Sequence, residues 1–551
     1  MWSQGYDPLG NVVLSTILAA TPIVVLLGTL AWLRWKAHKA ALLALATALV
    51  IAMLVFGMPA SMAVSAAVYG AAFGFLPIGY IVLNALFLYN LCNESGLFKT
   101  LRESITTVTA DRRLQVLLVA FGFGAFMEGG AGLGAPIAVV AAMLIGLGFP
   151  PLAASGLALV ANTIPVPFGA LGTPIVTLQA VTQLDLLKLS VATAWQLAPF
   201  CLIVPFWTVW VFAGFRGTIA VLPAILVAGI AYVVPQQLVA MYHGPWLTSV
   251  IASVISMGMV VLLLRVWHPK EIWTSTDPKN KTVGAGDTAE SQVHSHTPGQ
   301  VFRAWVPWMI LTVAVLLWGV PEVSALLNRL TTVQIEVPGL HNLIERLPPA
   351  VAVARLQPAI FNLNWLAAAG TGILFAAIIS GLVMGFSLPQ LARAYWKTIK
   401  NVKFALITIS TMVALGFTTR YAGMDATIGL AFAGTGMLYP FFAALVGWLG
   451  VASSGSDSAS NALFGSQQTI TAERLGLDPY MMAAANASGG CMGKMVSPQS
   501  IVIGSTATNW HGHEGDILRY VFFHSVTLAC LMGLWILVMT YLQPFSSLVT
   551  R

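Results

Sequence analysis

Uncharged, apolar runs of membrane-spanning length recur along this chain. The first extends from Val12 to Leu33, about the 20 residues that an α-helix needs to cross the hydrocarbon of a bilayer. Two more, Ala40 to Gly57 and Gly70 to Leu91, follow after short intervals. Further runs lie near residues 190–213, 217–240, 246–267, 303–320, 365–386, 404–421, 428–450 and 521–543. The pattern predicts an all-α polytopic membrane protein with roughly 12–14 transmembrane helices.

Few charged residues are present to cover a surface in water. Lys and Arg number 26 and Asp and Glu number 19 among 551 residues, which is 8% charged, whereas 58% of the residues are hydrophobic. An ordinary soluble domain is about 25% charged, so a soluble fold of this size is excluded and the lipid bilayer is the expected partner. The net charge of +7 is spread over short runs between apolar segments, so no nucleic-acid binding is expected.

Basic residues indicate which side of the membrane a connecting segment faces. Arg34, Lys36 and Lys39 directly follow the first apolar run, and connecting segments rich in Lys and Arg stay in the cytoplasm. We therefore expect the N-terminus to lie outside the cytoplasm.

A polar segment divides the chain into two membrane halves. Residues 268–302 have the Pro, Gly, Ser and mixed-charge content of a flexible linker, which we expect to be cytoplasmic. The predicted organisation is a first membrane half at 1–267 with a broken segment near 122–174, this linker, and a second membrane half at 303–551 with a broken segment near 450–505. A second polar stretch, Glu322 to Asn364, is interpreted as an interfacial loop on the opposite side.

The two halves contain a repeated motif. Residues 161–174 read ANTIPVPFGALGTP and residues 485–498 read ANASGGCMGKMVSP. Both fit A-N-x6-G-x3-[ST]-P, and the matched positions, such as Asn162 and Asn486, are all offset by 324 residues. An acid in a Gly- or Ser-rich stretch precedes each motif, Glu128 in the first half and Asp457 in the second. The alternative is a chance match between low-complexity segments, but one shared register across several identities argues against it.

The Gly- and Ser-rich stretches are poorly suited to plain helices in lipid. Runs such as residues 129–132 and 453–456 leave backbone groups and hydroxyls that need partners inside the hydrocarbon. We therefore predict discontinuous or re-entrant helices that line a cavity. Two repeats with a broken segment at corresponding places are typical of a secondary transporter whose substrate site lies at the repeat interface. The charges around the two segments favour an inverted orientation of the repeats.

Ionisable side chains in apolar segments are candidates for function because they are costly to keep there. Glu128, flanked by Phe126 and Met127, is suited to load and release a proton. Asp457 lies among serines, whose hydroxyls would stabilise its ionised form by hydrogen bonding. It is a candidate to hold a proton, a Na⁺ or a basic partner. We predict that Glu128 or Asp457 carries the coupling proton. The alternatives are a static ion pair for Glu128 and a helix cap for Asp457.

Lys494 is the strongest candidate for an anion site. Its ammonium group lies beside flexible glycines, where exposed backbone N–H groups and the positive end of a half-helix would hold a carboxylate. The alternative is a lysine that snorkels from a helix end. Arg420 is a second cation, with a role either in substrate binding or at an interface. The predicted substrate-binding residues are Lys494, Asn162, Asn486, Ser488, Ser497, Thr163, Ser454 and Arg420.

Motifs for catalysis or for a bound cofactor are weak in this sequence. The four cysteines are far apart and lack a CxxC spacing, which argues against a disulfide framework and a metal knuckle. Gly489 to Lys494 lacks the spacing of a phosphate loop. An intramembrane hydrolase that uses Ser454 or Ser456 with His511 or His513 is a rival class, although no spacing supports it. A passive channel would not need the internal repeat. We expect no metal, no cofactor and no enzymatic activity.

Several of these stretches resemble the L-lactate permease family of bacterial 2-hydroxymonocarboxylate transporters. The resemblance rests on EGGAGLGAP at 128–136, LGVASSGSDSASNALF at 449–464 and AANASGGCMGKMVSPQSI at 484–501, together with the 161–174 motif and YDPLGN at 6–11. It covers essentially the whole chain. It implies import of lactate, and often of glycolate, by proton symport across the bacterial inner membrane. In that membrane, the N-terminus that the basic residues place outside the cytoplasm would be periplasmic. A sodium-coupled carboxylate transporter of similar architecture is the alternative.

Overall fold

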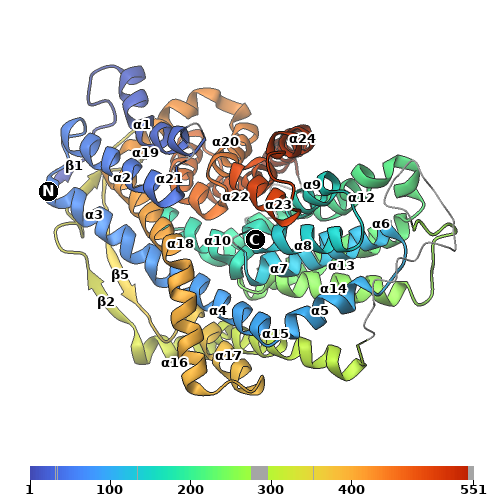
Figure 1. Ribbon diagram of the computed structural model, residues 1–551. Coiled ribbons are helices and arrows are strands. Elements are labelled where there is room, and N and C mark those ends of the chain that lie inside the picture. The colour runs from blue at the N-terminus through green and yellow to red at the C-terminus, as the bar shows by residue number, and fades with distance from the viewer. Residues whose placement is uncertain (32, 34, 133, 275–295, 352, 544–551) are drawn as a thin grey trace.

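The computed structural model describes residues 1–31, 33, 35–132, 134–274, 296–351 and 353–543, and Figure 1 shows the arrangement of their helices and strands. Within these ranges the chain is predominantly helical, with five short strands. Residues 275–295, the central part of the predicted linker at 268–302, lie outside the described residues.

Helices fill the first half of the chain. In chain order they are α1 (Val12–Ala31), α2 (Ala37–Leu54), α3 (Ala60–Phe73), the π-helical turn η1 (Gly74–Gly79), α4 (Tyr80–Glu94), α5 (Leu97–Thr106), α6 (Arg112–Gln115), the π-helical η2 (Val116–Phe123), α7 (Gly124–Gly130), α8 (Ala135–Gly146), α9 (Pro151–Ala161), the 3₁₀ turn η3 (Val166–Phe168), α10 (Gly169–Thr182), α11 (Leu186–Leu197), α12 (Phe200–Ile219), α13 (Leu222–Tyr242) and α14 (Thr248–Leu263).

The second half is also helical but carries most of the strands. After β1 (Trp2–Ser3) at the N-terminus, the remaining elements are α15 (Pro298–Gly319), α16 (Pro321–Thr331), β2 (Val333–Glu336), β3 (Ile344–Arg346), β4 (Arg355–Leu356), β5 (Ile360–Leu363), α17 (Ala369–Val383), α18 (Leu388–Ala422), α19 (Met424–Phe432), the 3₁₀ turn η4 (Ala433–Leu438), α20 (Tyr439–Ser454), α21 (Asp457–Leu475), α22 (Pro479–Gly493), the 3₁₀ turn η5 (Lys494–Val496), α23 (Pro498–Ala507) and α24 (Glu514–Tyr541).

The described part of the chain contains nine helical segments long and apolar enough to cross a membrane, or ten if the bent pair α9–α10 counts as one span. This number is lower than the 12–14 expected from the sequence, because α8, α14 and α17 are apolar but shorter than a full crossing. The prediction of a helical, multi-pass membrane protein is confirmed.

The segment expected to form an interfacial loop contains secondary structure instead. Residues 322–364 include most of α16 and the strands β2 to β5. β2 pairs antiparallel with β5, while β3 pairs antiparallel with β4 and parallel with β1, so that Trp2 lies opposite Ile344. The N-terminal strand joins a sheet more than 300 residues away, a long-range pairing that local sequence patterns do not reveal.

The two halves of the chain are interleaved. Helix α18, from the second half, packs against α2 and α3 of the first, and α17 packs against α4. α15 likewise packs against α5. Figure 1 shows the long α18 crossing beside α3 and α4.

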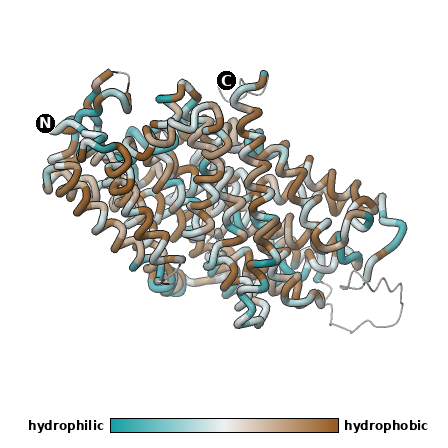
Figure 2. The backbone as a smooth tube through the Cα atoms, turned by 90° about the horizontal axis from the view of Figure 1, so that it is seen from above, coloured by the Kyte–Doolittle hydropathy of each residue, from teal (hydrophilic) through white to brown (hydrophobic). Residues whose placement is uncertain are grey.

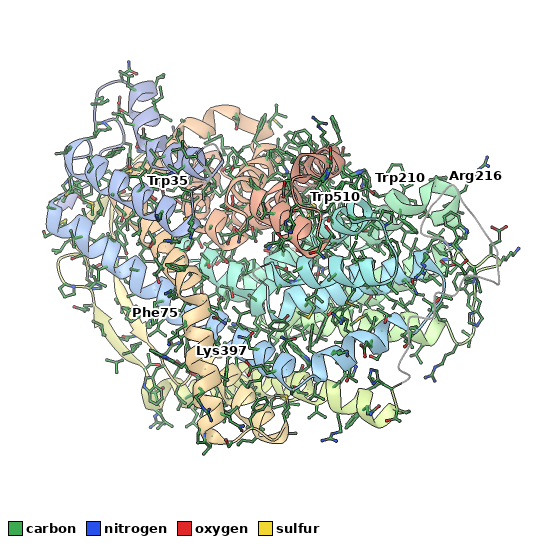
Figure 3. The ribbon with its side chains drawn as sticks, in the orientation of Figure 1. Trp35, Phe75, Trp210, Arg216, Lys397 and Trp510 are labelled. Carbon is green, nitrogen blue, oxygen red and sulfur yellow. The ribbon has the colours of Figure 1, made fainter. Side chains whose placement is uncertain are left out.

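Apolar side chains cover the periphery. Trp35, Phe75 and Trp210, labelled in Figure 3, are 43%, 52% and 39% exposed, respectively. In Figure 2 hydrophobic stretches run along helices throughout the molecule. Lipid is the solvent that such an outer surface requires.

Helices α20 and α22 approach so closely that their contact depends on glycine. A Cβ at Gly489 would collide with the backbone of Ala444, and one at Gly447 would collide with the backbone of Asn486. Small residues at helix contacts allow this approach, and van der Waals packing then stabilises the pair within a membrane.

We predict that Gly489→Ala destabilises the protein, because overpacking of a close contact costs about 1–3 kcal/mol. Gly258→Ala is the matched control, since a Cβ at Gly258 of α14 would meet no atom within 4 Å. Thermal unfolding of the purified protein in detergent should show a lower Tm for the first variant only. Equal Tm values for the two variants would contradict the close α20–α22 contact.

Candidate functional site

Four helix breaks occur at corresponding places in the two repeats. In the first repeat, residues 131–134 separate α7 from α8, and a bend of 69° separates α9 from α10. In the second, residues 455–456 separate α20 from α21, and the turn η5 separates α22 from α23. The pair α7–α8 therefore corresponds to α20–α21, and α9–α10 corresponds to α22–α23.

Local chemistry explains where the chain breaks. Gly132, Gly134 and Gly455 have φ values of +57°, +83° and +73°, which residues with a Cβ rarely adopt. The next helices begin with serine caps in the second repeat: Ser456 Oγ accepts from the N–H of Ala459 at 3.3 Å, and Ser497 Oγ accepts from the N–H of Ser500 at 3.2 Å.

The start of α10 is strained. Ala170 and Leu171 have φ values of +44° and +54° and are followed by Gly172 at +76°. Left-handed backbone at residues other than glycine costs of the order of 1–3 kcal/mol each and is concentrated at functional sites. This turn packs against Gly132, where an added Cβ would lie 2.8 Å from the Cβ of Ala170. The helix break before α8 therefore contacts the break at the start of α10.

The N-terminal ends of α8, α10, α21 and α23 surround a cavity of about 80 Å³. The helices pair crosswise between the repeats, α8 against α23 and α10 against α21. Helix N-termini present free N–H groups and partial positive charge, which favour a bound anion. Around these ends the cavity carries polar side chains, namely Thr173, Ser456, Ser458, Gln499 and Ser500, and apolar ones, namely Val82, Val166, Ile409 and Ile503.

An ion pair between the repeats lies at this cavity. Lys494 Nζ donates to Glu128 Oε1 at 3.3 Å, and the two side chains are 7% and 2% exposed. Asn162 Nδ2 donates to the other oxygen of Glu128 at 3.1 Å. Gly169 leaves room for this carboxylate, because a Cβ there would be 2.8 Å from Oε1. Glu128 thus has one charged and one neutral donor.

Asp457 is the second carboxylate at the cavity and has no such donors. It is 3% exposed, and both of its carboxylate oxygens are buried without a hydrogen-bond partner among the described residues. Lys494 and Glu128 are the charged groups that act on it electrostatically. A buried ionised carboxylate without donors carries a large desolvation cost, which a bound proton removes.

The structure brings together only some of the residues predicted from the sequence. Glu128, Asp457 and Lys494 line the cavity, and Asn162 reaches it through Glu128. Asn486 donates to Asn461 Oδ1 at 2.8 Å, within a buried network between α21 and α22.

The predicted hydroxyl residues mostly satisfy other groups. The Ser488 hydroxyl donates to Gln196. The hydroxyls of Thr163 and Ser454 donate to the backbone carbonyls of Val160 and Gly450, respectively. Ser497 caps α23 and donates to the carbonyl of Lys494.

Arg420 lies in the last turn of α18, 11 residues beyond the cavity-lining Ile409. Its Nη1 donates to the carbonyl of Val181 at 2.6 Å, so it anchors the end of α10 rather than lining the cavity.

Sequence reasoning missed several polar residues of the cavity, namely Thr173, Ser456, Ser458, Gln499 and Ser500. A signal was present for two of them. Thr173 occupies the [ST] position of the first motif, and Gln499 directly follows the Pro of the second. Both residues lie at the start of a helix that follows a break, α10 for Thr173 and α23 for Gln499. This shared position could have indicated that their side chains face the same cavity.

Comparison with known proteins identifies the family. The L-lactate permease family matches residues 15–543 of this chain. An L-lactate permease of Escherichia coli (strain K12) is 38% identical over 99% of this chain and 98% of its own length. The glycolate permease GlcA of the same strain is 40% identical over 98% of both chains, and an L-lactate permease of Bacillus subtilis (strain 168) is 38% identical over 98% of both. Because the family matches most of this chain and these relatives are 38–40% identical over nearly its whole length, the chain belongs to the L-lactate permease family.

Proposed function

We propose that this protein imports lactate, and related 2-hydroxymonocarboxylates such as glycolate, together with protons. The observation that carries the proposal is the cavity between the repeats, where a buried lysine and four helix N-termini face two buried carboxylates. The names of the relatives, L-lactate permease and glycolate permease, support this class of substrate.

Charge balance supports the coupling of anion and proton. With Glu128, Asp457 and Lys494 all charged, the cavity has one net negative charge, which repels a second anion at low dielectric. If a proton binds with the monocarboxylate, the net charge stays the same. Both charges would then move together, which is the requirement for symport.

We infer that the substrate carboxylate competes with Glu128 for Lys494. The ammonium group has three donors, and the Nζ–Oε1 distance of 3.3 Å is longer than a typical charge-assisted hydrogen bond of about 2.7–2.9 Å. The ends of α21 and α23 would donate to the same carboxylate. Hydroxyls of Thr173 and Ser456 are suited to the 2-hydroxyl group of the substrate.

Asp457 is the better candidate for the proton carrier. Glu128 has Lys494 and Asn162 as donors, which stabilise its charge, whereas Asp457 has no hydrogen-bond partner among the described residues. Uptake in sodium-free medium at fixed pH distinguishes proton coupling from sodium coupling. Movement of one repeat past the other would expose the cavity to each side in turn.

We also propose location in the bacterial inner membrane with a periplasmic N-terminus. Lys36 and Lys39, at the start of α2, support a cytoplasmic position for the turn after α1. The test is a Gly5→Cys variant, which a thiol reagent that cannot cross the membrane should label from the periplasmic side.

We predict that Lys494→Ala lowers lactate counterflow in proteoliposomes by about 30-fold or more, because removal of one partner of a buried, hydrogen-bonded charge pair costs about 2 kcal/mol or more. Lys99→Ala is the control, since that side chain is 72% exposed. Normal counterflow by the Lys494 variant would reject the substrate site.

We predict that Asp457→Asn keeps lactate counterflow but loses accumulation driven by a proton gradient, because the amide cannot carry the proton. Asp516→Asn, at an exposed position, is the control for the same chemical change. Both activities are measured in the same proteoliposomes. Accumulation that persists in Asp457→Asn would assign proton coupling to another group.

We predict that Glu128→Gln lowers Tm, since a buried ion pair that loses one partner is destabilised by about 3–5 kcal/mol. Lactate then supplies a carboxylate to the unpaired Lys494, so its addition should raise Tm more than in the wild-type protein. Glu94→Gln is the control, because its partner Lys397 is 66% exposed. An equal lactate effect in wild type and Glu128→Gln would contradict competition for Lys494.

A further inference from the structure

Two arginines lie near each other at the end of the molecule that holds the N-terminus, away from the cavity. Arg420 is in the last turn of α18, and Arg346, in β3, is 7% exposed. The two guanidinium groups act on each other electrostatically. Figure 1 shows β1, α19 and α21 near the N-terminus, and β3 pairs with β1.

The arginines leave buried donors unused. Nε of Arg346 and Nε of Arg420 are buried without an acceptor in the described part of the chain. Among the described residues, the side-chain amides of Gln467, on α21, and Gln357, after β4, are buried without partners as well, and so is Oδ2 of Asp425 at the start of α19. Buried polar groups normally have hydrogen-bond partners, so a group of unpaired ones requires an explanation.

The nearby charges do not balance. Asp425, 2% exposed at the start of α19, acts electrostatically on both Arg346 and Arg420. The other charged neighbours of Arg346 are Arg355 and Glu473, which pair with each other at 3.9 Å. Three arginines and two acids leave one positive charge in excess. A monovalent anion would neutralise it, and guanidinium groups match the geometry of a carboxylate.

The N-terminal segment covers this cluster. Gln4 Nε2 donates to the carbonyls of Arg420 and Tyr421 at 3.0 and 2.8 Å. Tyr6 lies beside Arg346, and its hydroxyl accepts from the backbone N–H of Leu347 at 3.0 Å. Gln4 and Tyr6 therefore hold the N-terminal segment over this cluster.

Two helices connect the cluster to the cavity. α10 runs from Thr173 at the cavity to Val181, the acceptor of Arg420, a rise of about 12 Å over eight residues. α21 runs from Asp457 at the cavity to Gln467, about 15 Å along the helix. The cluster thus lies about two to three helical turns from the substrate cavity along the same elements.

We propose that Arg346 and Arg420, with the amides of Gln357 and Gln467, form a second binding site for a small monocarboxylate anion of the transported class. The site would hold the anion near the surface before it reaches the cavity. The identity of this ligand rests on the proposed function, whereas the presence of an anion site rests on the arginines alone.

Lactate-induced thermal shifts in a Lys494→Ala background test the proposal, because this background removes the central ammonium group. The Lys494→Ala protein should still gain Tm on addition of lactate. The gain should disappear when Arg346→Gln and Arg420→Gln are added, and persist with Arg216→Gln, an exposed arginine that Figure 3 shows at the other end of the molecule. A shift absent from Lys494→Ala, or unchanged by the two arginine substitutions, would overturn the proposal.

Two further measurements keep the result unambiguous. The single variant Arg420→Gln keeps the more buried Arg346 intact, so it remains informative if the double substitution fails to fold. It should at least halve the lactate-induced rise in Tm. An undiminished rise would count against the proposal. Transport by each variant separates the two sites. Normal transport by Lys494→Ala would reject the central site. If Lys494→Ala is inactive but its lactate-induced rise in Tm is unchanged by the two arginine substitutions, the second site alone is rejected.

Discussion

The ion pair between Lys494 and Glu128 joins the two repeats inside the membrane protein. The residues are 366 positions apart, and both are almost fully buried. Charges in such surroundings are costly unless they are paired and hydrogen-bonded, and Asn162 supplies the additional donor. The packing of the two repeats brings these groups together, and it also positions Asp457 near them without a donor from the described part of the chain.

Helix breaks create the space in which these charges lie. An unbroken helix would satisfy its own backbone N–H groups, whereas the first turns of α8, α10, α21 and α23 have N–H groups without an intrahelical partner beside the cavity, of which Ser456 and Ser497 cap one each. The strained turn at Ala170 and Leu171 and the glycines of the other breaks make this arrangement sterically feasible. The polar α21 adds to it, since its amides and hydroxyls are buried in protein rather than exposed to lipid.

Much of the fold could be predicted from the sequence, because apolar length and the shared motif offset depend on local composition. Lys494, Glu128 and Asp457 were recognised as unusual for the same reason: an ionisable group in an apolar segment stands out. Their mutual distances could not be predicted, since these depend on how the repeats pack. Asn486 and Ser488 were indistinguishable from cavity residues in the motif, yet their side chains bond to Asn461 and Gln196.

Other parts were beyond sequence reasoning for different physical reasons. The strands between residues 333 and 363 are two to four residues long, and β3 pairs with the N-terminal β1. Such short strands have little periodicity to detect. The span count differed because α8, α14 and α17 are too short to cross as straight helices.

The glycine contact between α20 and α22 has a mechanical consequence. It packs these two helices closely together. Asp457 begins α21 two residues after α20 ends, and Lys494 directly follows α22. We therefore expect Lys494 and Asp457 to move together, whereas Glu128 belongs to the other repeat. Sliding of one repeat against the other would leave the first two groups in register and pull the third away, so the lysine would exchange its counter-ion at the moment the transporter changes shape.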